Sequence, residues 1–128
     1  MKKTAYLLLL TSLFALLSCT PNPNDYPVYN SQGTICVTAY HHSYIVPQLD
    51  AYLKYNTETS PGWDYKKYDK HLQADTLGRV CFDSLPIGFH CIMMLGYDPF
   101  YGGMVYGYKI ISIDKLVQTK ELKLPVTE

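Results

Sequence analysis

The chain has 128 residues, and its eleven lysines and arginines balance eleven aspartates and glutamates, a length that fits one domain. Arg79 is the only arginine and no basic run occurs, which argues against nucleic-acid binding. Thirteen tyrosines favour strands and a contact surface.

The chain begins with MKKTAYLLLLTSLFALLSC, which predicts an export signal. Lys2 and Lys3 give a positive start, and the apolar run after them is shorter than the roughly 20 residues of a membrane-spanning helix. The small residue Ser18 then precedes Cys19. We therefore expect residues 1–18 to be a signal peptide. Its removal leaves nine basic and eleven acidic side chains, since Lys2 and Lys3 leave with it.

The end of this segment, Leu16 to Cys19, resembles the lipobox of bacterial lipoproteins. The resemblance implies that Cys19 is diacylated and becomes the first mature residue, so that a membrane is a partner through the N-terminal lipid. Each buried methylene contributes about 0.8 kcal/mol, and two or three acyl chains anchor a protein stably. In such lipoproteins an aspartate after the cysteine favours the inner membrane. Thr20 stands there instead, so we expect the cell outer membrane, on either face. The alternative is an ordinary cleaved signal with an incidental cysteine.

Residues 19–32 are rich in proline and asparagine, which predicts an extended tether. The folded domain is expected over residues 33–128. There the apolar residues recur every two positions, which is the period of a strand. In TICVTAY, for example, Ile35 and Val37 alternate with Cys36 and Thr38.

Seven short runs of this kind predict an all-β fold, a seven-stranded Greek-key β-sandwich. The runs are residues 34–40, 48–55, 71–75, 79–82, 89–95, 109–113 and 121–124. Residues 63–71 can form at most a turn or two of helix. The segments Asp75–Gly78 and Leu85–Gly88 suit tight turns, because glycine tolerates a positive φ.

The order of these strands and turns resembles a known family. Ala51–Tyr55, Ala74–Phe82, Leu85–Cys91 and Gly96–Asp98 follow the motif order of carboxypeptidase regulatory-like domains and, more loosely, of Cna B-type and transthyretin-like modules. They are similar to small single-domain lipoproteins of Bacteroidetes-type bacteria. The resemblance implies a prealbumin-like sandwich in which Leu85 fills the core. It implies no particular activity, because such folds host many functions.

The alternation of side chains along a strand predicts which face of the sheet each cysteine points to. If Val80 faces the core, Cys81 faces outward, and Cys36 does the same between Ile35 and Val37. A Cys36–Cys81 disulfide is therefore possible if their strands are neighbours, because exported chains meet an oxidising compartment. The family pattern places Cys91 inward, as a buried free thiol, together with its neighbours Phe89 and Met93. It places His90 and Ile92 outward.

No metal, cofactor or catalytic site is expected from the motifs. His41 and His42 are neighbours that point to opposite faces of a strand, so they cannot share a tetrahedral ion unless they lie in a turn. No C-x-x-C, H-E-x-x-H or H-x-H spacing occurs, and no serine lies in a nucleophile elbow. Asp98 is explained by a turn. We expect a protein that is not an enzyme.

The aromatic residues of two loops form the predicted ligand surface. They are Trp63, Tyr65 and Tyr68, then Tyr97, Phe100 and Tyr101. The alternative is that these side chains cap the core or pack on each other. The sequence thus predicts a lipid-anchored envelope protein with one binding or scaffolding domain, whose partner is a glycan or an envelope protein. A carbohydrate-binding accessory module is the second interpretation, and a small hydrolase or metal-dependent enzyme is the third.

Overall fold

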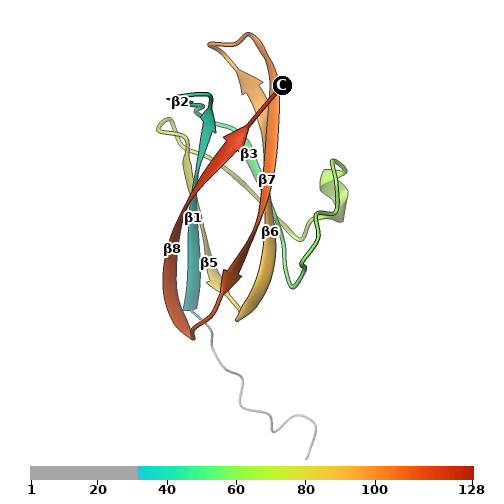
Figure 1. Cartoon of the computed structure of the whole chain (residues 1–128), viewed down its shortest axis with the longest axis vertical. Helices are drawn as coiled ribbons and strands as arrows, with labels where there is room; N and C mark the ends of the chain where they lie inside the picture. Colours follow the sequence, from blue (N-terminus) through green and yellow to red (C-terminus); the bar gives the residue numbers. More distant parts are fainter. Residues whose placement is uncertain (1–31) are drawn as a thin grey trace, which may run out of the picture.

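The computed structural model describes residues 32–128, which fold into two β-sheets packed face to face (Figure 1). The strands are β1 (Gln32–His41), β2 (Tyr44–Ile45), β3 (Asp50–Lys54), β4 (Lys70–Gln73), β5 (Arg79–Leu85), β6 (Gly88–Asp98), β7 (Gly103–Ile113) and β8 (Val117–Val126). A single turn of 3-10 helix, η1 (Tyr65–Lys67), lies between β3 and β4. The seven predicted strands are all present, and the two-residue β2 is added to them.

In the first sheet, here sheet A, β1 is the central strand. It pairs antiparallel with β5 and β2 on one edge, and parallel with β8 on the other, from Gln32↔Val117 to His41↔Val126. The second sheet, sheet B, has the order β4-β3-β6-β7 with antiparallel neighbours.

The two sheets are joined by a crossover that makes the Greek key. The hairpin β3–β4 lies in sheet B, β5 crosses to sheet A, and β6 returns to pair with β3. The prediction of an all-β, prealbumin-like Greek-key sandwich is therefore confirmed. Among residues 32–128, no helix reaches the length and apolarity needed to cross a bilayer.

The core lies between the sheets and follows the period-two pattern. Fully buried side chains such as Ile35, Val37 and Leu53 point inward from alternate positions. In β5 the alternation is interrupted by a register shift after Phe82, so that Leu85, three residues later, is buried as well. Each large apolar side chain removed from water contributes about 1.5–3 kcal/mol to folding. The inward positions of Phe82 and Leu85 agree with the sequence pattern.

The faces of β6 are the reverse of those that the family pattern implied. Ile92 pairs with Leu53 and points into the core, whereas Cys91 and Met93 lie on the outer side of sheet B. All of them are buried, because a loop covers the outer side of this strand. The prediction of a buried, free Cys91 thiol is correct, but its predicted face is wrong. A strand that is buried on both sides has a continuous run of apolar residues, so the sequence does not show which of them face the core.

His90 therefore faces the core rather than solvent, with no exposed surface. Its Nε2 lies 2.8 Å from the carbonyl oxygen of Pro86, and its Nδ1 accepts from the backbone N–H of Asn56 at 3.3 Å. Both ring nitrogens are thus satisfied by the backbone, which is what allows an imidazole inside the sandwich.

The turn before β5 is built as its residue types predict. The Asp75 carboxylate accepts from the backbone N–H groups of Leu77 and Arg79, both at 2.9 Å. Gly78 has φ of +72°, and a Cβ atom there would lie 2.8 Å from the Val46 carbonyl oxygen. Glycine is therefore required at this turn.

The expected signal peptide, lipid-bearing Cys19 and tether fall in residues 1–31 and lie outside the described residues.

Candidate functional site

The outer face of sheet B carries a set of aromatic and thioether side chains in register across its strands. Tyr52 on β3, Met93 on β6 and Tyr108 on β7 form one cross-strand row. Tyr97 and Met104 form another at the end of the sheet. Outward positions of a solvated sheet are normally polar, so this aromatic face is unusual and suited to contact with a partner.

The loop of residues 55–69 folds back over this face, on the outer side of sheet B (Figure 1). Its start is held by the Thr57 N–H, which donates to the Phe89 carbonyl at 2.9 Å, and its end by the Asp69 N–H, which donates to Leu53 at 2.8 Å. In its middle, Trp63 packs edge-on against Tyr106 with ring centroids 3.7 Å apart. The loop is therefore attached to three strands.

The carboxylate of Asp69 also ties the loop to β3. It accepts from Lys54 Nζ and from the Tyr55 backbone N–H, both at 2.8 Å. These hydrogen bonds lower the pKa of Asp69. An acid used in this way stays ionised and structural at neutral pH.

Cys91 lies beneath this loop, with Ser60 and Tyr68 as its polar neighbours. Burial raises the pKa of the Cys91 thiol, and burial also raises the pKa of Tyr68. The Tyr68 hydroxyl donates to the Gly62 carbonyl oxygen at 2.9 Å, which closes the loop on itself. The thiol is thus buried and protonated at neutral pH, which makes it unreactive.

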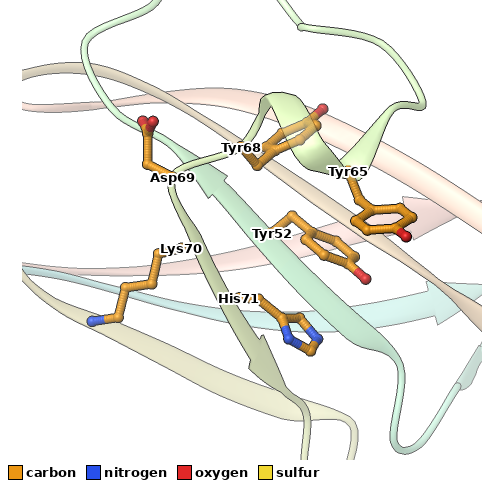
Figure 2. Close-up of a pocket in the computed structure, with 6 residues that line it drawn as sticks. All are labelled: Tyr52, Tyr65, Tyr68, Asp69, Lys70 and His71. Carbon is orange, nitrogen blue, oxygen red and sulfur yellow. The ribbon is translucent and has the colours of Figure 1, made fainter.

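A hollow of about 490 Å³ opens beside the loop, lined by Tyr52, Tyr65, Tyr68, Asp69, Lys70 and His71. Figure 2 shows the rings of Tyr52 and His71 lying one against the other, with Tyr65 next to them and Lys70 pointing away. Tyr52 stacks on His71 at 4.7 Å between centroids and 19° between planes. The two residues are register partners on β3 and β4, so the sheet itself sets this stack. We call it the Tyr52–His71 platform.

Polar groups surround the platform. His71 Nε2 lies 2.8 Å from the Asp50 carboxylate, which fixes the ring. Tyr65 adds a half-exposed ring 5.7 Å from that of Tyr52. Flat rings with hydroxyl and carboxylate groups at their edges suit a ligand that has an apolar face and a polar rim.

A second hollow of about 330 Å³ lies on the other side of the loop, lined by Ser60, Gly62, Trp63 and Tyr108. Trp63 and Tyr108 are each about half exposed. The loop residues therefore contribute to two hollows on one aromatic face.

The six residues of the predicted ligand surface divide into two groups in space. Trp63, Tyr65 and Tyr68 lie in the covering loop, and Tyr97 lies on the same aromatic face, 59% exposed. Phe100 and Tyr101 lie instead in the β6–β7 turn, next to the histidine cluster described below. The sequence prediction missed Tyr52 and His71, whose only signal was an aromatic residue at an outward position of a strand.

A buried polar cluster occupies the end of the sandwich near the β6–β7 turn. His41 Nδ1 lies 2.7 Å from Asp98 Oδ2, and the Tyr44 hydroxyl donates to the same oxygen at 2.6 Å. Asp98 Oδ1 accepts from the backbone N–H groups of Phe100 and Tyr101. Asp98 has no exposed surface, and His41 is 1% exposed.

These contacts shift the pKa values of the cluster. Burial alone would raise the pKa of Asp98, but the hydrogen bonds from Tyr44, His41 and the two amides outweigh burial and bring that pKa to about 2. The hydrogen bond to Asp98 raises the pKa of His41 above its ordinary value, although burial opposes it. The same carboxylate, with burial, raises the pKa of Tyr44 to about 12. Asp98 therefore does more than form the turn that the sequence predicted.

His41 and His42 do not lie on opposite faces, as strand parity would require. His42 has φ of +54° in the turn after β1, and its ring stacks on that of His41 with centroids 4.3 Å apart. The parity argument against a shared ion thus does not hold here. Within residues 32–128, one group of histidine and carboxylate side chains has ligand atoms close enough for one cation: His41, His42 and Glu128.

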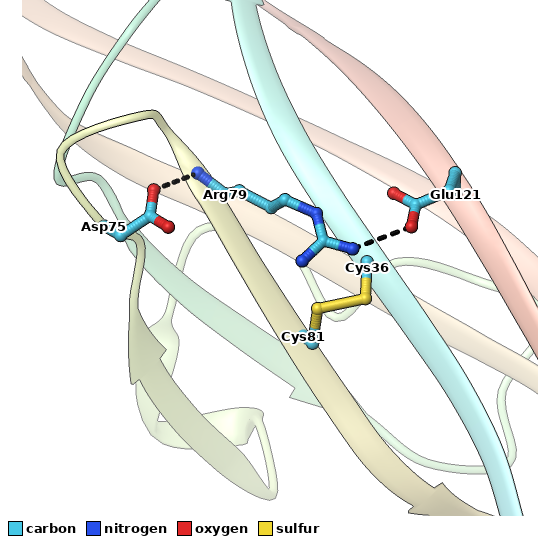
Figure 3. The surroundings of a disulfide bond; sticks show 5 residues. All are labelled: Cys36, Asp75, Arg79, Cys81 and Glu121. Carbon is cyan, nitrogen blue, oxygen red and sulfur yellow. Dashed lines mark hydrogen bonds and ion pairs between the residues drawn. A yellow bond between two sulfur atoms is a disulfide. The ribbon is translucent and has the colours of Figure 1, made fainter.

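Cys36 and Cys81 form a disulfide on the outer face of sheet A (Figure 3). They are direct register partners on β1 and β5, which is the arrangement that the sequence left open. Figure 3 shows the Arg79 side chain passing over β1 beside the disulfide. It donates to Glu121 on β8 at 2.7 Å.

Comparison with known proteins gives a likeness of fold. No protein-family model matches the sequence, and no curated protein matches it. Crystal structures of BcpA, the major pilin subunit of Bacillus cereus, and of a variant of it match with TM-scores of 0.52 and 0.53 at 15% identity. The match to the variant covers 77% of this chain and 30% of the pilin, so this chain spans less than a third of that protein's length. A candidate carbohydrate-binding protein from Pseudomonas aeruginosa matches with a TM-score of 0.45 at 16% identity, over 77% of this chain and 97% of that one.

Proposed function

We propose that this protein is a non-enzymatic, lipid-anchored module of the cell envelope that binds a ligand on the aromatic face of sheet B. The Tyr52–His71 platform carries the proposal, because the fold presents two stacked rings at the floor of a hollow of about 490 Å³. These rings lie outside the core and pack on one another, and they remain open to a ligand on the side of the hollow.

The proposed location is supported by the chain's own chemistry. Export is favoured by the signal-like residues 1–18, and anchoring by the lipobox resemblance at Cys19. The Cys36–Cys81 disulfide suits an oxidising compartment outside the cytosol. Membership of the carboxypeptidase regulatory-like family, and residence in the outer membrane, are parts of the same proposal.

A glycan is the ligand class that the platform favours, and an envelope protein is the other candidate. The apolar faces of sugar rings pack on aromatic side chains, while their hydroxyls bond to carboxylates and amines at the edge. Asp50 stands at the edge of the platform in such a position, bonded to the His71 ring. A protein partner is favoured by the extent of the aromatic face, which reaches Tyr97 and Met104.

The proposal is tested with the full chain purified in detergent. Binding is measured on a glycan array and, in parallel, by capture of solubilised outer-membrane proteins identified by mass spectrometry. We expect Tyr52→Ala to weaken binding of the captured ligand at least tenfold. Phe100→Ala is the matched control, because Phe100 is an aromatic side chain that is 76% exposed and lies off this face.

Two results would contradict the proposal. One is a Tyr52→Ala variant that binds as tightly as the parent chain, and the other is a chain that retains no glycan and no envelope protein. The anchor is tested separately by mass spectrometry of the native protein, where an unacylated N-terminus, or one that is not Cys19, would exclude the lipid.

A further inference from the structure

One end of the sandwich brings two histidines and a glutamate within reach of one ion. His41 ends β1, His42 follows it in the turn, and Glu128 comes just after β8; one ligand atom of each lies within 4.8 Å of the others. We infer that these three side chains bind a divalent transition-metal ion of the Zn²⁺ class. The site shares no residue with the aromatic hollows, so the metal proposal can be tested independently of the proposed function.

His41 is already oriented as a metal ligand. Its Nδ1 faces the Asp98 carboxylate at 2.7 Å, while Tyr44 and two backbone N–H groups hold that carboxylate in place. A proton on Nδ1 leaves the lone pair of Nε2 as the coordinating one. Histidines that bind metals are oriented by a carboxylate in this way, and the buried Asp98 fills that position.

Glu128 is brought to Nε2 by the backbone. Thr127 exchanges two hydrogen bonds of 2.8 Å with Tyr106, which fixes the chain next to Glu128 against β7. The Glu128 carboxylate oxygen Oε2 then lies 3.0 Å from His41 Nε2. Two ligand atoms bound to one zinc ion at about 2.0–2.2 Å each are separated by a little more than this, so His41 and Glu128 need only small side-chain movements to share an ion.

The charges of the cluster also suit a cation. The carboxylates of Asp98 and Glu128 lie on either side of the His41 ring, and a divalent ion bound at Nε2 would balance their charge. His42 and Glu128 are exposed, so an ion can enter from solvent. Three protein ligands with an open side give a site that keeps a water or accepts a ligand atom in its fourth position.

The simpler alternative is a doubly protonated His41 that pairs with both carboxylates and binds no metal. The two are separated by titrating Zn²⁺ into the full chain in detergent by isothermal titration calorimetry. We expect one Zn²⁺ per chain, with affinity reduced at least tenfold by His42→Ala and by Glu128→Gln. Both positions are at the surface, so the variants keep the fold, which circular dichroism checks.

His71→Ala is the matched control, because it removes an exposed histidine outside this cluster that also lies next to a carboxylate. It should leave Zn²⁺ affinity unchanged. Co²⁺ in place of Zn²⁺ gives an independent readout, since its visible spectrum reports nitrogen and oxygen ligands and should weaken in the His42→Ala variant. Absence of saturable Zn²⁺ uptake would overturn the inference and leave the protonated His41. Uptake that depends on His71 rather than on His42 and Glu128 would overturn it as well.

Discussion

The two outer faces of the sandwich differ in how they are stabilised. On sheet A outward side chains are joined in pairs across strands, by the Cys36–Cys81 disulfide and the Arg79–Glu121 ion pair. On sheet B they are aromatic and partly covered by the loop of residues 55–69. The outer face of sheet A is stabilised by these two links between its strands. The outer face of sheet B has half-exposed aromatic rings, and for this reason we assign the ligand to sheet B.

Loss of the disulfide should have the largest effect, and it should act on stability alone. The bond joins residues 45 positions apart, and removing such a cross-link costs about 2–4 kcal/mol. The Cys36→Ser/Cys81→Ser variant should lower the free energy of urea unfolding by that amount, while the folded variant binds ligand as the parent does. Reductant should destabilise the parent and leave the variant unchanged. A parent indifferent to reductant would show that the bond does not stabilise sheet A.

A smaller effect is expected on the covered face when the loop is loosened. Tyr68→Phe removes the hydroxyl that donates to Gly62, at a cost of about 0.5–1.5 kcal/mol. Because the loop shields Cys91, the rate at which a thiol reagent labels this cysteine should rise in the variant. Tyr101→Phe is the control, since Tyr101 lies in the β6–β7 turn away from the loop. Equal labelling rates in Tyr68→Phe and the parent would mean that the loop does not gate the thiol.

The smallest effect is expected at the exposed ion pair of sheet A. Arg79 and Glu121 are 46% and 63% exposed, so their pairing should contribute less than about 1 kcal/mol, and less at high salt. A double-mutant cycle with Arg79→Ala and Glu121→Ala, in urea at two ionic strengths, measures this coupling. A coupling that persists in high salt would indicate that Arg79 acts by covering the disulfide rather than by its charge.

The same contrast explains what could be predicted from the sequence. Around the two cysteines, β1 and β5 alternate buried apolar residues with outward ones, so the outward directions of Cys36 and Cys81 could be predicted. The run FHCIMML on β6 is largely apolar on both faces, because the core covers one side of the strand and the loop covers the other. The sequence pattern therefore could not predict which of its residues point into the core. The Greek-key fold could be predicted because the strands, turns and motifs follow the order found in the family that the sequence resembles.

The candidate sites depended on contacts between distant residues. The loop aromatics Trp63, Tyr65 and Tyr68 could be identified from their setting, but the Tyr52–His71 platform depends on the register of β3 with β4. His41 meets Asp98 across 57 positions of sequence, and the turn that stacks His41 on His42 was not visible in the pattern. Strand period predicts faces, and only the fold brings the ends of different strands together.

The parallel pairing of β1 with β8 has a consequence for orientation. Both strands run the same way over ten residue pairs, so the chain enters at one end of the sandwich and both strands finish at the other, about 30 Å away. If Cys19 holds the lipid, the predicted tether joins the entry end to the bilayer. His41, Glu128 and the exposed rings of Phe100 and Tyr101 lie at the opposite end of the sandwich, away from the point where the tether is attached. The aromatic face of sheet B lies along the side, between these two ends.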